Sequence, residues 1–384
     1  MKRKQKLLVG ASLATLLIVL GCGQAMVDEE APAEEAQGQQ VPMFEVDPMW
    51  PKNLPDHWLM GPTIGVDVDS QNHIWVVHRN TPDQFVARTE IGMVQDPPLA
   101  ECCQPGDPVL EFDQEGNLVG SWGGPGTETS DEYVWPLSNH GITIDHMDNV
   151  WIGGNGDDDG LVLKFSRDGT FLLQIGTLGE TGDSHDTARL HSPADIGVDP
   201  DANEVYIADG YTNRRVIVFD ADTGEYKRHW GAYGRAPDDG PLDPYDQNGE
   251  PSPIFGDTVH CVTISNEGLV YVCDRMNHRL QIFQKDGTFV TEGFIGRDTA
   301  GASVWDIDFS QDDAQEFIIN ADGGNHLLWM VRREELETID TLGRRGRNAG
   351  QFESPHSLAV DSSGNMYVGE TLDGRRMQKF VPIR

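Results

Sequence analysis

Three histidines stand at the same point of a repeated sequence pattern, and three imidazoles are a common set of metal ligands. His140, His260 and His356 open the stretches HGITID, HCVTIS and HSLAVD, and each stretch continues through a turn into a second apolar run, VWIGG, LVYVCD or MYVGE. The intervals between the histidines are 120 and 96 residues. Adjacent propeller repeats are only about 40–50 residues long, so each interval has room for one further copy of the pattern.

Those further copies are present, and they lack the histidine. PADIGVDPDANEVYIADG follows His140, SVWDIDFSQDDAQEFIINADG follows His260, and PTIGVDVDSQNHIWVVHRN begins the series. Aligned on the first strand of each copy, the histidine position reads Thr63, His140, Ala194, His260, Ser303 and His356. We therefore expect six copies that alternate between a histidine and a small residue.

Six copies of a four-stranded unit predict an all-β fold, a six-bladed β-propeller closed around an axis. Each of the first five copies continues into an outer strand pair with an Asp-Gly type turn, as in LVLKFSRDGTFLLQIG. The last copy has only three strands, so we expect residues 43–49 to supply its fourth. Blades two, four and six then lie about 120° apart. Their histidines would converge on the axis as a three-nitrogen site with an open fourth position, the catalytic form of zinc coordination.

The amino terminus predicts export and lipid anchoring. A basic start precedes an apolar run at residues 7–20, and Cys22 follows in VLGC, which resembles a bacterial lipobox. We expect a lipoprotein signal peptide at residues 1–21, lipidation of Cys22, an acidic disordered tether at 22–42 and the propeller at 43–384. A transmembrane anchor is the alternative, although 14 apolar residues are short for a membrane span. The expected location is the cell envelope, in the outer membrane facing the periplasm or the cell surface.

The chain carries a formal net charge of −35. Such a surface repels nucleic acid and anionic lipid headgroups, so we expect no nucleic-acid partner and membrane contact only through the lipid anchor. We expect a monomer that takes a small-molecule or peptide substrate. Acidic turns at residues 155–160 (NGDDDG) and 199–204 (DPDANE) favour a solvated, salt-adapted surface, and calcium binding is the alternative.

Four cysteines remain after Cys22. Cys261 and Cys273 flank a hairpin symmetrically, so we expect them to face each other across two strands. An exported compartment permits a disulfide there, and two buried thiols are the alternative. Cys102 and Cys103 are adjacent in the sequence, which leaves their pairing open.

The repeats resemble the NHL-repeat propellers, and among them the lyase domain of the peptidylglycine amidating enzymes, the peptidyl-α-hydroxyglycine α-amidating lyases. The resemblance covers Pro62 to Phe380 and is most specific at HGITIDHMDNVWIGG, PADIGVDPDANEVYIADGYTNRRVIVF, HCVTISNEGLVYVCDRMNHRLQIF and SPHSLAVDSSGNMYVGE. It implies zinc on the three histidines, a catalytic tyrosine at Tyr211 in DGYTNRR and an active-site arginine at Arg275 in DRMNHR. Tyr211 would take the proton of a metal-bound substrate hydroxyl and Arg275 would orient a carboxylate. A structural role in a turn is the alternative for both residues.

Several positions depart from that family. A further catalytic arginine of the family falls near Leu99, within the long connection between residues 79 and 108, and Arg79 and Arg88 are the candidates to replace it. The methionine two residues before the third histidine is Ser354, and the calcium-binding Asp just after it is Ser357. The family's disulfide cysteines are replaced at Thr212, Tyr271 and Ile282. The sequence therefore supports the metal site better than the amidating reaction.

Three functions follow from these observations. The first is an exported, zinc-dependent peptidyl-α-hydroxyglycine (peptidylamidoglycolate) lyase, which releases an amide and glyoxylate. The alternatives are another metal-dependent propeller enzyme, such as a hydrolase or lactonase, and a non-catalytic NHL-repeat binding scaffold of the cell envelope. Imidazole alone selects poorly among zinc, iron, manganese and copper. An open metal position beside the Tyr211 hydroxyl would favour an enzyme.

Overall fold

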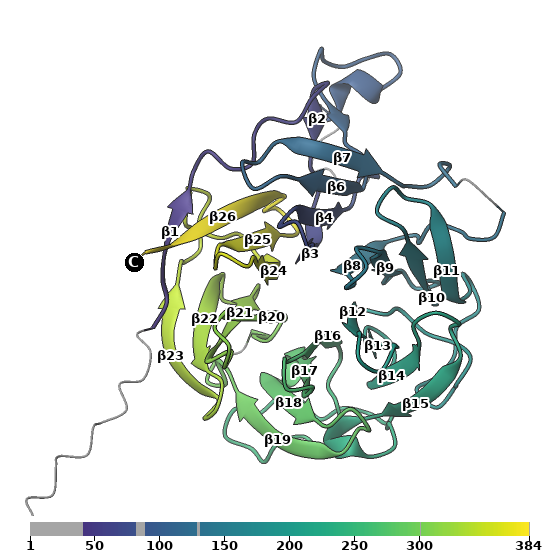
Figure 1. Cartoon of the computed structure of the whole chain (residues 1–384), viewed down its shortest axis with the longest axis vertical. Coiled ribbons are helices and arrows are strands. Elements are labelled where there is room, and N and C mark those ends of the chain that lie inside the picture. The colour runs from purple at the N-terminus through teal and green to yellow at the C-terminus, as the bar shows by residue number, and fades with distance from the viewer. Residues whose placement is uncertain (1–40, 82–88, 129–130, 300, 384) are drawn as a thin grey trace, which may run out of the picture. The chain divides into compact units, whose positions relative to one another are not determined.

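A computed structural model defines residues 41–81, 89–128, 131–299 and 301–383, and the description is limited to these. Six four-stranded antiparallel sheets are arranged radially around one axis, in chain order (Figure 1). This confirms the expected all-β, six-bladed propeller. Within the defined residues, no helix is long and apolar enough to cross a membrane. Cys22 and Arg88 lie outside the described residues.

The first three blades each use four strands in succession from the axis outwards. Blade one consists of β3 (Thr63–Val68), β4 (Ile74–His78), β6 (Val109–Phe112) and β7 (Leu118–Trp122). Blade two consists of β8 (Asn139–Ile144), β9 (Val150–Gly154), β10 (Leu161–Phe165) and β11 (Phe171–Gly176). Blade three consists of β12 (Asp195–Asp199), β13 (Glu204–Asp209), β14 (Arg215–Asp220) and β15 (Tyr226–Trp230).

The last three blades close the ring. Blade four consists of β16 (Val259–Ile264), β17 (Val270–Asp274), β18 (Arg279–Phe283) and β19 (Phe289–Phe294). Blade five consists of β20 (Asp306–Phe309), β21 (Phe317–Asp322), β22 (Leu327–Arg332) and β23 (Glu337–Leu342). Blade six consists of β24 (Pro355–Val360), β25 (Met366–Glu370), β26 (Arg376–Ile383) and β1 (Met43–Asp47).

Blade six joins the two ends of the described chain. Strand β1 pairs antiparallel with β26, from Met43 opposite Ile383 to Asp47 opposite Lys379. This confirms that the early segment supplies the missing outer strand. The closure covers the edge of β26, which would otherwise expose unpaired backbone groups.

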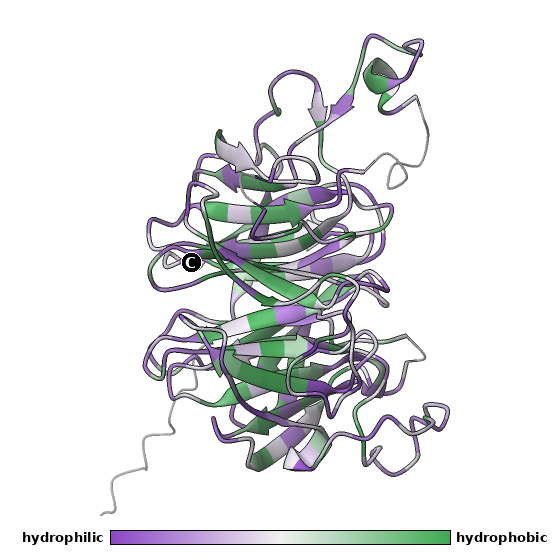
Figure 2. Ribbon diagram, turned by 90° about the vertical axis from the view of Figure 1, so that its right-hand side faces the viewer, coloured by the Kyte–Doolittle hydropathy of each residue, from purple (hydrophilic) through white to green (hydrophobic). Residues whose placement is uncertain are grey.

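The strand directions place the two longest connections between strands on the same face of the propeller. Each inner strand begins at this face, the second strand returns to it, and the fourth strand ends there. The described parts of the connection 79–108 (β4 to β6) and the connection 231–258 (β15 to β16) therefore lie on the same face, and the edge view shows long connections projecting from one side (Figure 2). We call it the histidine face, because the three histidines stand where inner strands begin.

These connections contain the remaining small elements. The 3-10 turns are η2 (Gly92–Val94), η3 (Ala232–Gly234) and η4 (Arg275–Asn277). The connection 79–108 contains β5 (Gln104–Pro105), which pairs in parallel with β2 (Trp58–Leu59). A pair of two-residue strands is too short to produce a recognisable alternation in the sequence.

The strand register corrects the alignment of the odd-numbered blades. Thr143 lies opposite Trp151 on β9, and the equivalent pairs are Asp67 with Trp75 in blade one and Asp308 with Ile319 in blade five. His140 lies three residues before Thr143. The residues three positions before Asp67 and Asp308 are Ile64 and Trp305, which are therefore the counterparts of His140. The predicted Thr63 and Ser303 are therefore wrong by one and two residues, and small residues do not alternate with histidine. Ala194 keeps its predicted place in blade three.

The inner strands enclose a cavity of about 200 Å³ on the axis, and four half-buried carboxyl groups line it: Asp67, Asp195, Asp306 and Asp308. Each accepts a hydrogen bond from a backbone N–H on the inner strand of the next blade. Ser357, where the resembling family has an Asp, instead accepts from the Val66 N–H at 3.0 Å. These side chains link neighbouring blades at the axis, where backbone pairing between blades is absent from the described sheets.

Burial makes three of these groups titrate near neutral pH. Loss of hydration raises the pKa values of Asp67 and Asp306 to about 7 and that of Asp308 to about 6. Each folded-state pKa lies above the ordinary unfolded value, so the stabilisation is fully present below about pH 4 and is lost as the pH rises towards 7. We predict that Asp67→Asn makes the fall of unfolding free energy between pH 4 and 7 shallower, as measured by urea unfolding. The exposed change Asp313→Asn should leave the slope unaltered, and an unaltered slope in Asp67→Asn would contradict the account.

Candidate metal centre

The histidine face brings His140, His260 and His356 together at the axis. They come from β8, β16 and β24, three alternate blades, and all three side chains are buried. Their ring centroids are 4.8–5.2 Å apart. One ring nitrogen of each lies within 4.8 Å of the others, which is the spacing of ligands around a single ion.

Hydrogen bonds to the neighbouring blades determine which nitrogen faces the axis. The Nδ1 of His140 donates to the Ala194 carbonyl at 2.6 Å, and the Nδ1 of His260 donates to the Trp305 carbonyl at 2.5 Å. Each acceptor occupies the histidine-equivalent position of the next blade. The His356 ring lies beside the equivalent Ile64 carbonyl, although its Nδ1 makes no hydrogen bond of good geometry with the described residues. With Nδ1 protonated, Nε2 keeps its lone pair for a metal.

The three imidazoles are held in the neutral form that a metal requires. Burial, reinforced by the charge of Arg79, lowers the pKa of His140 to about 3. Burial and the charge of Arg275 hold the pKa of His260 well below its ordinary value. Burial and the neighbouring His140 do the same for the pKa of His356. Three buried imidazoles whose pKa values are lowered in this way bind protons weakly, and their free nitrogen lone pairs are available to a metal ion.

Tyr211 directs its hydroxyl to the same point. The residue follows β13, and its Oη lies 3.0 Å from the Nε2 of His140 and 3.1 Å from the Nε2 of His260. The ring meets that of His140 edge to face, with centroids 4.9 Å apart. The phenol oxygen is therefore within reach of any group bound between the imidazoles, as a general acid or base must be.

Arg275 stands next to Tyr211, at the start of η4. Its Nη1 donates to the Tyr211 Oη at 3.4 Å and its Nη2 to the Thr258 Oγ1 at 2.9 Å. Its guanidinium lies over the rings of Tyr211 and Trp305, 5.3 and 4.8 Å from their centroids. The Nε is buried without a partner among the described residues, so a donor remains for a bound anion.

The sequence alignment did not identify Trp305, because it placed Ser303 of blade five opposite the histidines. Trp305 replaces the histidine of its blade, and its ring lies 5.8 Å from that of His260 and 5.4 Å from that of His356. The signal that could have found it is the turn residue five positions later, Ser310, which corresponds to Asp145 after His140.

Arg79 is the counterpart of Arg275 on the opposite blade. His78 pairs with Thr63 on blade one as Asp274 pairs with Val259 on blade four, and an arginine follows each. Its charge lowers the pKa values of His140 and His356, and its Nη2 donates to the Asn155 Oδ1 at 2.8 Å. Of the two candidates for the further arginine, Arg79 is therefore at the site. Leu99 lies exposed in the connection 79–108.

Buried ion pairs fix the turns that carry Tyr211 and Arg275. The fully buried Arg215 pairs with Asp209 at 2.8 Å, and Arg279 pairs with Asp274 at 2.7 Å. In each turn an asparagine amide also donates to the same aspartate. Charged groups buried in this way keep their geometry, because losing one partner would leave the other uncompensated.

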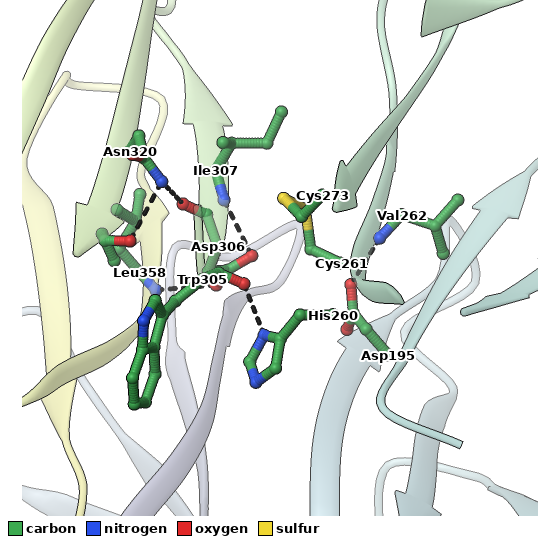
Figure 3. The surroundings of a disulfide bond; sticks show 11 residues. Asp195, His260, Cys261, Val262, Cys273, Trp305, Asp306, Ile307, Asn320 and Leu358 are labelled. Atoms are coloured by element: carbon green, nitrogen blue, oxygen red, sulfur yellow. Dashed lines mark hydrogen bonds between the residues drawn. A yellow bond between two sulfur atoms is a disulfide. The ribbon is translucent and has the colours of Figure 1, made fainter. Parts of the chain in front are cut away.

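A disulfide joins β16, which carries His260, to β17, which directly precedes Arg275. Cys261 follows His260 on β16, Cys273 precedes Asp274 on β17, and the two sulfurs are bonded (Figure 3). The structure thus selects the disulfide over two thiols at this pair. Cys102 and Cys103 are also bonded to each other.

Each acidic turn considered for calcium has a carboxylate that is used within the protein. In residues 155–160, Asp159 accepts backbone N–H groups of Leu137, Ser138 and Gly156. In residues 199–204, Asp199 forms an ion pair with Lys285 at 2.6 Å. These carboxylates therefore already have donors or a cation as partners.

The residues at the axis fit a zinc ion. Three neutral imidazoles with converging nitrogens and a polar open side match the ligand set of a catalytic zinc site. We predict that purified protein binds about one zinc per chain and that His140→Ala, His260→Ala and His356→Ala each remove most of it, as measured by elemental analysis. His185→Ala, an exposed histidine, is the control. Full zinc content in the triple alanine variant would refute the assignment.

Comparisons with known proteins agree with this architecture. The NHL repeat family model matches residues 258–283, the segment that begins at Thr258 and contains His260 and Arg275. The chain is 28% identical over 255 residues to peptidyl-glycine alpha-amidating monooxygenase B of Xenopus laevis, covering 64% of this chain and 26% of that protein. It is 28% identical over 265 residues to peptidyl-alpha-hydroxyglycine alpha-amidating lyase 1 of Drosophila melanogaster, covering 63% and 44% of the two chains.

Two further matches span most of the chain. NHL repeat-containing protein 3 of Mus musculus is 25% identical over 407 residues, covering 100% of this chain and 97% of that protein. A solved streptogramin B lyase superposes with a TM-score of 0.51 at 11% identity, covering 89% and 98% of the two chains, and it shows the fold alone.

Proposed function

We propose that this chain, an NHL-repeat six-bladed β-propeller that resembles the peptidyl-α-hydroxyglycine α-amidating lyases, is itself a metal-dependent lyase of that kind. Its substrate would be a peptide or small acyl group ending in α-hydroxyglycine, and its products an amide and glyoxylate. The observation that carries the proposal is the placement of the Tyr211 hydroxyl within 3.0–3.1 Å of two metal-ligand nitrogens, with Arg275 beside it.

The reaction needs one proton to move from oxygen to nitrogen. The carbinol O–H loses its proton, its electron pair forms the C=O of glyoxylate, the C–N bond breaks, and the amide nitrogen gains a proton. Tyr211 is placed to accept the first proton and to return it to the nitrogen, so the protein ends unchanged. Zinc, when bound, would supply Lewis acidity towards the hydroxyl.

The two arginines would hold the anionic end of the substrate. The Arg275 Nε is a donor that no described residue accepts from, and the Nη1 of the same guanidinium donates to the Tyr211 Oη. Arg79 adds a second cation from the opposite blade. In a chain of net charge −35, two arginines beside three neutral imidazoles make the axis attractive to a carboxylate.

Replacement of Tyr211 by Phe tests the proton transfer. The ring remains and no metal ligand is lost, so zinc content and folding should persist. We predict that release of glyoxylate from N-benzoyl-α-hydroxyglycine falls about 10²-fold or more, the scale of general acid–base catalysis. Tyr226→Phe, on the outer strand β15, is the control. Undiminished turnover in Tyr211→Phe would assign the proton to another group, and no turnover by zinc-loaded wild-type protein would refute the lyase.

A pair of arginine variants tests the replacement of the family's further arginine. Arg79→Ala removes a charged contact worth about 1.5–3 kcal/mol, so we predict a fall in kcat/KM of about 10- to 100-fold on the same substrate. Arg88→Ala should retain the wild-type value. The reverse result, with activity lost only in Arg88→Ala, would show that Arg79 does not serve this role.

We further propose that the enzyme acts in the cell envelope, attached through a lipid on Cys22. The support is the basic, apolar and VLGC sequence of residues 1–22. A disulfide beside the metal ligand His260 is consistent with an oxidising compartment.

A further inference from the structure

The connection 231–258 forms a second cavity on the histidine face, outside the metal centre. Its volume is about 500 Å³, in the range of small-ligand sites. Prolines and the aromatic residues Tyr245 and Phe294 contribute to its walls. The same walls carry four carboxylates, Asp238, Asp243, Asp246 and Glu250, and a single cation, Arg297.

The cavity adjoins the proposed catalytic turn. Asn277 lines it and lies two residues from Arg275, a distance of at most about 7 Å along the chain. On the other wall, Ile254 accepts hydrogen bonds from the Asn277 amide and from the buried Arg279. A peptide whose last residue reaches Arg275 can therefore place an earlier side chain in the cavity.

Contacts to buried groups hold the cavity open. Tyr245 stacks on the His278 ring at 4.4 Å and donates to the Arg297 carbonyl at 2.6 Å. Arg214, three residues after Tyr211, donates to the Gly240 carbonyl at 2.6 Å and pairs with Asp257. The connection is thus tied to the turns of both proposed catalytic residues, and its shape does not depend on a ligand.

The one cation of the cavity wall has partners within the protein, whereas the carboxylates form no ion pairs with described residues. Arg297 lies over the Phe294 ring at 4.4 Å and donates to the Gly249 carbonyl. Asp243 and Glu250, by contrast, are exposed, and none of the four carboxylates forms an ion pair with any residue described in the structure. An apolar floor with an unpaired anionic rim suits the long stem and charged end of a lysine or arginine side chain.

We propose that this cavity is a specificity subsite for a basic side chain, lysine or arginine, within the two residues that precede the α-hydroxyglycine. The inference rests on the proposed lyase function and adds to it a substrate class, peptides that are basic near their carboxyl end. The metal centre would select the hydroxyglycine, and the cavity would select the peptide.

The test compares kcat/KM for peptides that differ only in one side chain. Acetyl-Lys-Ala-α-hydroxyglycine and acetyl-Ala-Lys-α-hydroxyglycine are paired with their glutamate counterparts, and N-benzoyl-α-hydroxyglycine serves as a substrate that does not reach the cavity. We expect the better lysine peptide to exceed its glutamate counterpart by about tenfold at low salt, equivalent to two or more exposed ion pairs, and less at high salt.

Two double variants separate the cavity from the general negative charge of the protein. Asp243→Asn with Glu250→Gln should reduce the lysine advantage to about threefold or less and leave turnover of the benzoyl substrate unaltered. Asp313→Asn with Glu335→Gln removes the same charge from exposed turns at the opposite ends of the strands and should keep the advantage. Equal rates for lysine and glutamate peptides, or an advantage that survives in the cavity variant, would overturn the subsite.

Failure of the lyase itself would be recognised separately. If zinc-loaded protein does not turn over the benzoyl substrate, the proposed function is wrong, and the cavity is then tested by calorimetric binding of acetyl-Lys-Ala-amide. Binding that is weakened in the cavity variant and retained in the control variant would support a basic-peptide site. Equal binding in all three proteins, or none in the wild type, would overturn it.

Discussion

The hydrogen bond from a histidine Nδ1 to a backbone carbonyl of the next blade is the contact on which the site depends. It fixes the tautomer, turns Nε2 to the axis, and fastens an even-numbered blade to the following odd-numbered one. The acceptor is the residue that replaces histidine in the next blade. From His140 to Trp305 the sequence therefore alternates between a histidine that donates this hydrogen bond and a residue whose carbonyl accepts it. The odd-numbered blades carry none of the three histidines, but the carbonyls of Ala194 and Trp305 orient the rings of His140 and His260.

The propeller fold makes this plan possible by repeating one register. Each inner strand starts at the same level, and the carboxyl groups of Asp67, Asp195, Asp306 and Asp308 bind the next inner strand below the imidazoles. The second strands return Arg79, Tyr211 and Arg275 to the level of the three imidazoles. The proposed charge, base and metal ligands therefore come from five different blades, and they meet because each inner strand begins, and each second strand ends, at the histidine face.

The blade architecture and the position of the histidines were predictable from the sequence, because hairpin turns and the alternation of apolar residues are local signals. Six blades, closure through β1 and the gathering of the three histidines follow from them. The partners of histidine in blades one and five were misplaced by one and two residues. The bulge that follows Thr63 also occurs in the histidine-bearing strands, so the strand pairing identifies Ile64 and Trp305 as the equivalent residues. The equivalence of Arg79 and Arg275 was readable in VVHRN and VCDRMN, yet it became clear only from the pairing. The basic-peptide cavity could not be foreseen, because its shape comes from contacts such as Tyr245 on His278.

The central claim is that one metal ion sits on the propeller axis between three alternate blades. Crystals of zinc-loaded protein, measured on both sides of the zinc absorption edge, test it most directly. The account predicts one anomalous peak, about 2.0–2.1 Å from the Nε2 of each of His140, His260 and His356, with the Tyr211 hydroxyl nearby. A peak only among the channel carboxylates, or no peak at the histidines under saturating zinc, would contradict it.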